Sequence, residues 1–213
     1  MRWKIATILS VLIASTAMPS LWAQGHWWDH PNPKVGSGGV YRITTKDGHQ
    51  SEMTWAIVGK DTLGGQEGYW FEERMTIPGH GTNITKLLMV FTNGKPDIKE
   101  MIMQPPGRPP MEMPLMMMGM MKKSMQSAIA NSSSTTVGIE TITVPGGTFL
   151  CDHLRSSANG VTSDEWVSKS GPAFGLIKTA SAQGTIELEK VLTGQTSEIT
   201  GTPKQMNMPM YGH

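Results

Sequence analysis

The stretch MIMQPPGRPPMEMPLMMMGMMKKSM, residues 101–125, divides a chain that otherwise has the pattern of short β-strands. It holds ten of the chain's 18 methionines. Four prolines between 105 and 110 can continue neither a strand ladder nor a helix, which predicts an extended loop there. After Pro114 the apolar residues recur at helical spacing, which predicts an amphipathic helix from about Leu115 to Ala130. The Pro- and Met-rich insert at 105–130 therefore separates two β-rich halves.

Both halves alternate apolar and polar residues between turn signals, the pattern of half-buried β-strands. Asp47-Gly48 and Asn93-Gly94 are hairpin signals of the first half, and Pro145-Gly146-Gly147 and Asn159-Gly160 separate strands of the second. Residues 84–91 are apolar on both faces, so both sides of that strand should be covered. Strands are expected at 40–45, 53–57, 69–77, 84–91, 97–104, 137–144, 148–156, 161–168, 175–182 and 185–193, with a polar loop at 131–136.

These elements predict a mainly β fold. A large, strongly curved antiparallel sheet of about ten strands should form, because the strands follow one another through short turns. The methionine-rich helix should lie over the concave face of this sheet; the resemblance described below implies that the sheet is an unclosed half-barrel and the helix its lid. Met118, Met121 and Met125 share the apolar stripe of that helix.

Residues 1–23 have the composition of a secretory signal peptide. A basic start with Arg2 and Lys4 precedes an apolar run that is well short of the roughly 20 residues needed to span a bilayer. Cleavage is expected after Ala23, which would place the mature chain in the periplasm or outside the cell. The other expected segments are a flexible N-terminal segment at 24–39, a half-barrel domain at 40–193 and a disordered Met- and His-containing tail at 194–213.

Charge and cysteine content narrow the possible partners and the source of stability. The 18 Lys and Arg residues nearly balance the 17 Asp and Glu residues, and no basic run is present. A nucleic-acid partner is therefore not expected. Cys151 is the single cysteine, so no internal disulfide can form and the fold must depend on its hydrophobic core.

Four short motifs carry a resemblance to a known group of proteins. They are EGYWFE at 67–72, GTFLCDH at 147–153, EWVS at 165–168 and GLIK at 175–178. An exported chain of this size with these motifs resembles uncharacterised periplasmic proteins related to the lipoprotein carrier and receptor superfamily, over roughly residues 40–193. The resemblance implies an unclosed β-barrel whose hydrophobic cavity is covered by helices and accepts acyl chains. The methionine-rich insert and the two His-containing tails depart from those carriers.

The methionines favour a binding site for an apolar molecule. Methionine side chains are flexible and polarizable, so a surface lined by them adapts to ligands of varied shape. A methionine lid over an apolar sheet would form a pocket suited to an acyl chain or another hydrophobic small molecule. Trp27-Trp28 could add a transient contact with a membrane surface. The predicted lid and pocket residues are Met116, Met117, Met118, Met121, Met125, Trp55, Leu87, Met89 and Phe91.

Copper binding is the alternative hypothesis, and packing of an ordinary helix would also account for part of the methionine content. Thioether sulfur is a soft ligand suited to Cu(I), and Met-x-Met units can place several sulfurs around one ion. After cleavage at Ala23, a His at the third position could also close a square-planar site for Cu(II) or Ni(II). The predicted metal ligands are His26, Met111, Met113, Met206, Met208, Met210 and His213.

No motif in the chain favours catalysis. The sequence has no nucleophile elbow, phosphate loop or dinucleotide fingerprint. The neighbours Glu72-Glu73 and Asp164-Glu165 should point to opposite faces of their strands, too far apart for a close acid and base pair. Cys151 and His153 share a strand face and could be metal ligands or a nucleophile with its base. A lone cysteine beside apolar residues is more often a buried packing residue. With none of these motifs favouring catalysis, a non-enzymatic binding protein without a cofactor is expected.

Overall fold

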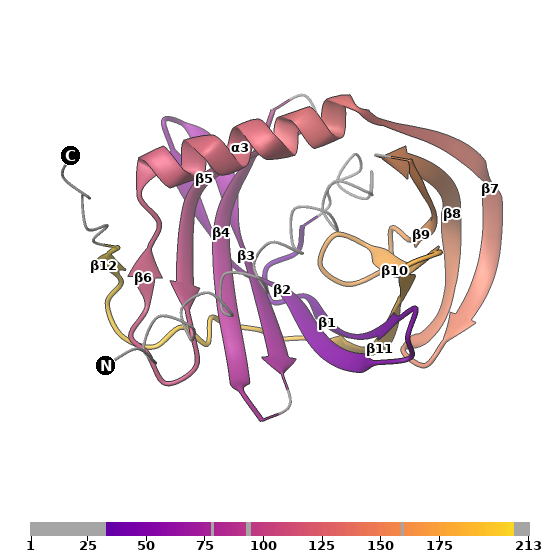
Figure 1. Cartoon of the computed structure of the whole chain (residues 1–213), viewed down its shortest axis with the longest axis horizontal. Coiled ribbons are helices and arrows are strands. Elements are labelled where there is room, and N and C mark those ends of the chain that lie inside the picture. Colours follow the sequence, from indigo (N-terminus) through magenta and orange to yellow (C-terminus); the bar gives the residue numbers. More distant parts are fainter. Residues whose placement is uncertain (1–32, 78, 93–94, 159, 207–213) are drawn as a thin grey trace, which may run out of the picture.

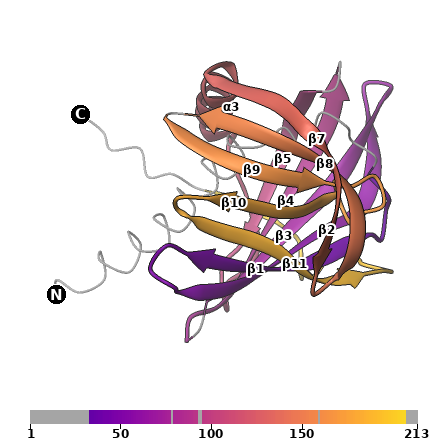
Figure 2. The ribbon, with the colours of Figure 1, turned by 90° about the vertical axis from the view of Figure 1, so that its right-hand side faces the viewer.

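The computed structural model describes residues 33–77, 79–92, 95–158 and 160–206. They form one sheet of twelve strands and one α-helix (Figure 1, Figure 2). The strand order is β12-β6-β5-β4-β3-β2-β1-β11-β10-β9-β8-β7, and the two edges of the sheet do not pair. All neighbouring strands are antiparallel except β12 and β6, which are parallel. The predicted mainly β fold with an unclosed, curved sheet is confirmed.

The elements fall on either side of the helix. The first half consists of β1 (Gly38–Thr45), β2 (Gln50–Leu63), β3 (Gln66–Ile77), β4 (Gly81–Thr92), β5 (Lys95–Gln104) and β6 (Met111–Glu112). The helix is α3 (Leu115–Ala130). The second half consists of β7 (Ser132–Val144), β8 (Gly147–Ala158), β9 (Val161–Val167), β10 (Leu176–Ser181), β11 (Gly184–Leu192) and β12 (Lys204–Gln205).

Each predicted strand overlaps an observed one, and α3 has the predicted bounds. The two short strands β6 and β12 were not expected, which is why the sheet has twelve strands and not about ten. The polar loop predicted at 131–136 is wrong, because β7 begins at Ser132 and pairs with β8 along its length. The missed part of this edge strand, residues 132–136, has only Ser and Thr side chains on both faces, so it lacks the period-two signal that identified 137–144.

Strand β1 joins the two halves of the chain, because it pairs with β2 on one side and with β11 on the other. Its first residues must be glycine. A Cβ at Gly38 would lie 2.9 Å from the Trp55 carbonyl oxygen, and one at Gly39 would lie 2.7 Å from a methyl carbon of Leu188. These two glycines therefore permit close packing at the end of segment 24–39, where a flexible joint was expected.

The sheet curves where strand registers shift. Each such irregularity inserts an extra residue, which bends the strand and increases its twist. Repeated along the sheet, the bends turn it toward a half-barrel, as Figure 2 shows. Such shifts occur at Val40/Tyr41, Ile57/Gly59, Leu88/Met89 and Thr136/Gly138.

Helix α3 crosses the open side of the curved sheet (Figure 1). It follows β6 near one edge of the sheet and precedes β7 at the other edge, and its main contacts are with β5 and β7. The insert therefore connects two edges that the sheet itself leaves apart. Among the described residues, no helix is long and apolar enough to cross a membrane.

Residues 194–206, here called the C-terminal strap, run across the first half of the sheet to β12 beside β6 (Figure 1). Thr200 and Gln104 exchange two hydrogen bonds, of 3.0 and 3.1 Å, on the way. The strap then adds the short parallel strand β12 to β6. This part of the tail has defined positions, in place of the disorder expected for 194–213; residues 207–213 lie outside the described residues.

Two charged residues of β3 hold the strap. Arg74 binds Glu72 at 2.8 Å and Glu198 at 2.7 Å, and it also donates to the Thr196 carbonyl at 2.9 Å. The Ser197 hydroxyl donates to Glu72 at 2.5 Å. Glu72 and Arg74 are both buried, so each needs these partners to offset the cost of leaving water. The strap is ordered because it supplies them.

Replacing Arg74 with Met should test this arrangement. The variant leaves the Glu72 carboxylate buried without its cation, so the free energy of unfolding should fall by about 3 kcal/mol. The strap should also become sensitive to proteases. Urea unfolding and limited proteolysis measure the two effects. Lys60→Met, which removes an exposed ion pair with Glu67, is the matched control and should change neither; equal effects of the two substitutions would contradict the role assigned to Arg74.

Candidate functional site

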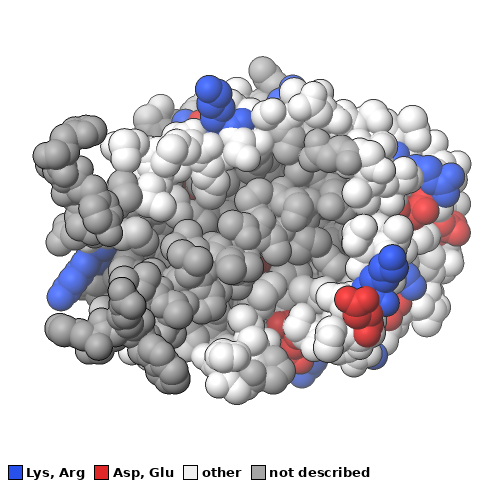
Figure 3. Space-filling view, viewed as in Figure 1, with Lys and Arg blue, Asp and Glu red and all other residues white. Residues whose placement is uncertain are grey.

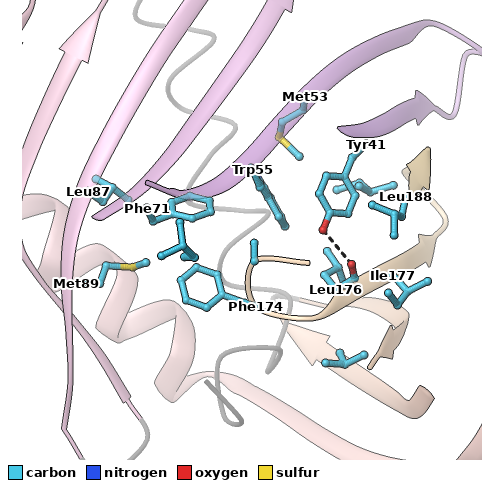
Figure 4. Close-up of a cluster of buried hydrophobic side chains, with 14 of the residues drawn as sticks. Tyr41, Met53, Trp55, Phe71, Leu87, Met89, Phe174, Leu176, Ile177 and Leu188 are labelled. Carbon is cyan, nitrogen blue, oxygen red and sulfur yellow. Dashed lines mark hydrogen bonds between the residues drawn. The ribbon is translucent and has the colours of Figure 1, made fainter. Parts of the chain in front are cut away.

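A row of aromatic rings runs through the core of the protein (Figure 4). The ring centroids of Tyr41 and Trp55 are 5.1 Å apart, and those of Trp55 and Phe71 are 5.9 Å apart. Phe174 lies 5.3 Å from Phe71 and 5.9 Å from Phe91 by the same measure. These separations are those of favourable aromatic pairs, so the row forms one continuous apolar surface.

The structure brings the predicted pocket residues together. Trp55, Leu87 and Met89 are fully buried members of one core cluster, and Phe91 is partly buried against it. They share the face of the sheet on which the aromatic row lies, as their alternate positions in β2 and β4 indicate. Met118 of α3 belongs to the same cluster. The predicted pocket is thus an apolar surface that the helix contacts.

The pocket residues predicted from the sequence did not include three aromatic residues of this surface, Tyr41, Phe71 and Phe174. Tyr41 and Phe71 occupy alternating strand positions, the same signal that identified Trp55, so they could have been found. Phe174 lies in the connection between β9 and β10, beside the positive φ angles of Ala173 and Gly175. No periodicity in that short connection indicates that it turns into the core.

The predicted lid methionines differ in burial. Met118 is only 4% exposed, and Met117 and Met121 are partly buried, whereas Met116 is 64% exposed. The side chain of Met125 lies outside the described part of the chain. Leu115 and Met120 are also exposed, at 81% and 61%. Among the described side chains of α3, Met118 is the one that is fully buried, and Met117 and Met121 add partial burial.

One ion pair also connects α3 to the sheet, and a second pair within β5 shares its carboxylate. Lys122 of the helix binds Asp97 of β5 at 2.7 Å, and Lys99 binds the same carboxylate at 2.6 Å. Partial burial acts to raise the pKa of Asp97, but the hydrogen bonds from the two lysines outweigh it and hold that pKa below its usual value. These groups are about a third exposed, so the attachment is weak and reversible.

Glu73 places a carboxyl group inside the apolar core. Its side chain is 3% exposed, and it lies opposite Trp55, whose indole N–H donates to Oε2 at 3.0 Å. Its other oxygen, Oε1, is buried and has no hydrogen-bond partner among the described residues. Burial raises the pKa of Glu73 to about 7, although the bond from Trp55 opposes the shift. Glu72 points to the other face, as the strand pattern predicts.

A small cleft lies at the end of β9, between Asp152 and the connection that carries Phe174. Its volume is about 20 Å³, which is room for roughly one water molecule. The predicted lid and pocket residues do not line it. An acyl chain could not enter this cleft.

Cys151 and His153 do not act together. Burial raises the pKa of the Cys151 thiol to about 11, with smaller contributions from nearby carboxylates, which disfavours a reactive thiolate. The His153 ring instead lies between two carboxylates, 2.8 Å from Glu140 and 2.9 Å from Asp164, and stacks on Trp166. Cys151 therefore packs in the hydrophobic core, whereas His153 belongs to a polar group with Glu140, Asp164 and Trp166.

Some of the predicted metal ligands come together at one edge of the sheet. Met111 lies in β6, Met113 follows that strand, and Met206 follows β12, its parallel partner. The described residues contain no group of three or more His, Cys, Asp or Glu side chains that could hold a metal ion. A metal at this edge would therefore depend on methionine sulfur. The predicted ligands His26, Met208, Met210 and His213 lie outside the described residues.

Comparisons with known proteins give distant likenesses. A candidate lipoprotein from Parabacteroides distasonis is 12% identical, with a TM-score of 0.41, over 76% of this chain and 97% of its own. A candidate exported protein with a YmcC-like fold from Bacteroides fragilis is 11% identical, with a TM-score of 0.41, over 75% of this chain and 96% of its own. No protein-family model and no curated protein matches the chain. The resemblance to lipoprotein carriers stays a prediction.

The buried carboxyl group should make stability depend on pH. The pKa of Glu73 is higher in the folded protein than the usual 4.5, so folding becomes less favourable as pH rises from about 4.5 to about 7. The loss should be roughly 3 kcal/mol. Glu73→Gln should remove this part of the pH dependence when urea unfolding is measured at pH 5 and pH 8. A variant with the same pH dependence as the natural protein would show that Glu73 is ionised in both states.

Proposed function

We propose that this is an exported, non-enzymatic binding protein that holds an acyl chain or another apolar small molecule between α3 and the inner face of the sheet. The observation that carries the proposal is the continuous apolar surface of the aromatic row, together with the helix that crosses the open side of the sheet (Figure 1). Helix α3 bridges the two edges of the sheet and contributes one fully buried side chain among those described, Met118, to a continuous apolar surface. A helix attached in this way can exchange its contacts for those of a ligand.

The energies involved favour such an exchange. Withdrawing a buried Met side chain costs about 1.5–3 kcal/mol. An acyl chain recovers about 0.8 kcal/mol for each buried CH₂ group, so about two to four methylenes offset the loss of Met118. A chain of about twelve carbons recovers about 10 kcal/mol, which leaves a few kcal/mol when the association cost is near its lower limit of about 4 kcal/mol. Binding would therefore be reversible.

Glu73 would recognise the polar end of the ligand. Its Oε1 atom is buried in the same core and has no described partner, and an unpaired buried oxygen costs about 1–3 kcal/mol. A hydroxyl group on the ligand could donate to this oxygen or accept from its protonated form. A carboxylate would repel the ionised Glu73. The favoured ligand is therefore a neutral amphiphile such as a fatty alcohol or a monoacylglycerol, in preference to a fatty-acid anion.

The outer side of α3 suggests how such a ligand could arrive. Leu115, Met116 and Met120 are exposed apolar side chains on the helix. Large apolar groups in this position suit a transient contact with a membrane surface. The lid would then face the source of its ligand.

Substituting Met118 tests the lid. The mature chain, freed of lipid, is titrated with a fluorescent long-chain alcohol. In the complex the Met118 side chain would cover the bound ligand, so Met118→Gln, which sets a polar amide against the acyl chain, should weaken binding roughly tenfold or more. Met118→Leu keeps an apolar side chain of similar size and should bind normally. Met116→Gln, at an exposed position of the same helix, is the matched control. Equal affinity of the Met118→Gln and Met116→Gln variants would contradict the proposal.

Substituting Asp97 tests the movement of the lid. Asp97→Asn removes the ion pair with Lys122, so the helix should open more often and the association rate of the fluorescent alcohol should rise by up to about fivefold. Stopped-flow fluorescence measures this rate. Glu67→Gln breaks an exposed ion pair away from the helix and should leave the rate unchanged. An unchanged rate in Asp97→Asn would indicate that binding does not require α3 to move.

A further inference from the structure

Two methionine-containing segments that are distant in sequence lie side by side at one edge of the sheet. Strand β6 pairs with β5 on one side, with Met103 opposite Met111. On its other side it pairs with β12 in parallel, with Lys204 beside Met111 and Gln205 beside Glu112. The strap thus brings its own methionine to the methionines of the insert.

The register places these methionines on the same face of the sheet. The Met113 amide donates to the Met101 carbonyl at 2.9 Å, which continues the antiparallel pairing beyond Met111. The Met206 amide donates to the Glu112 carbonyl at 3.1 Å, which continues the parallel pairing and sets Met206 beside Met113. Partners in a ladder, and every second residue along a strand, share one face. Met101, Met103, Met111, Met113 and Met206 therefore form one group.

The five methionines differ in burial. Met101 is fully buried in the core cluster. Met103 and Met113 pack against that cluster and are partly buried, and Met111 and Met206 are also partly buried. Four thioethers thus lie where the core meets the surface, so they are held by packing but can be reached from solution.

Packing alone is a poor reason for this composition. An ordered Met side chain loses about 1.5–2 kcal/mol of rotamer entropy, against about 0.5–1 kcal/mol for Leu or Ile. Four Leu or Ile residues would cover the same edge at lower cost. What methionine adds is sulfur, a soft ligand that selects Cu(I) among biological metal ions. Directly opposite side chains in a ladder have Cβ atoms about 5 Å apart, and diagonal neighbours about 7–8 Å. Met111 and Met113 lie between Met103 and Met206, so their flexible thioethers can meet those of both neighbours at one ion.

We propose that Met103, Met111, Met113 and Met206 form a binding site for one Cu(I) ion at the edge made by β5, β6 and β12. The site does not include Met118 or the aromatic row. Binding of the ion would link the strap to the insert, so it would also stabilise the pairing of β12 with β6.

A Cu(I) titration of the mature protein tests the site. Under anaerobic conditions and in competition with a coloured Cu(I) chelator, the protein should bind one equivalent. The variant Met111→Leu/Met113→Leu/Met206→Leu keeps the volume of the edge and should lose at least 100-fold in affinity. The variant Met116→Leu/Met117→Leu/Met120→Leu removes the same number of thioethers from α3 and should bind like the natural protein. The absence of binding in the natural protein, or equal affinity in the two variants, would overturn the proposal.

Two further measurements separate this edge from other sites. X-ray absorption of the Cu(I)-loaded protein should show only sulfur neighbours, and nitrogen or oxygen neighbours would overturn the assignment. A chain that ends at Met206 should keep its one equivalent of Cu(I), because the proposed ligands are all retained. Loss of binding in that chain would overturn the proposal by placing the essential ligands beyond Met206. Fluorescent alcohol binding by the triple Leu variant should be unchanged, which distinguishes this site from the apolar one.

Discussion

The pairing of β1 with β11 is the interaction on which the rest of the structure depends. It converts two runs of consecutive hairpins into one sheet. The Tyr41 hydroxyl of β1 also donates to the Leu176 carbonyl of β10, the next strand beyond β11, at 3.0 Å. The first strand of the first half, β1, pairs with β11 of the second half, so β6 and β7 lie toward opposite edges of the sheet. The insert between them therefore starts near one edge and finishes at the other. Helix α3 must therefore cross the open side, whatever its sequence.

Three consecutive residues of β3 show how the two faces of this sheet differ. Glu73 points into the apolar core, where one carboxyl oxygen has no described partner. Its neighbours Glu72 and Arg74 point the other way and bind the strap. A buried polar group without a partner is costly and suits ligand recognition, whereas a buried ion pair with several hydrogen bonds fixes a position. The same strand therefore carries a candidate recognition group and a structural anchor.

Methionine has several roles within this one fold. Met53 and Met89 fill the core, Met118 attaches the helix to it, and the methionines beside β6 gather at an edge. The first two roles use the adaptable packing of methionine, whereas the proposed copper site would use its soft sulfur. Composition alone could not separate them, because the residue type is the same and only its surroundings differ.

The local elements could be predicted from the sequence, including the bounds of α3 and the apolar positions of Trp55, Leu87 and Met89, because hydrophobic period and turn chemistry act over a few residues. The folded structure was needed to find the course of the strap, the inward turn of Phe174 and the pairing that sets Met206 beside Met113. These features depend on hydrogen-bond register and on the partners of buried charges across large sequence separations. Such contacts form once the chain is folded and leave no local period in the sequence.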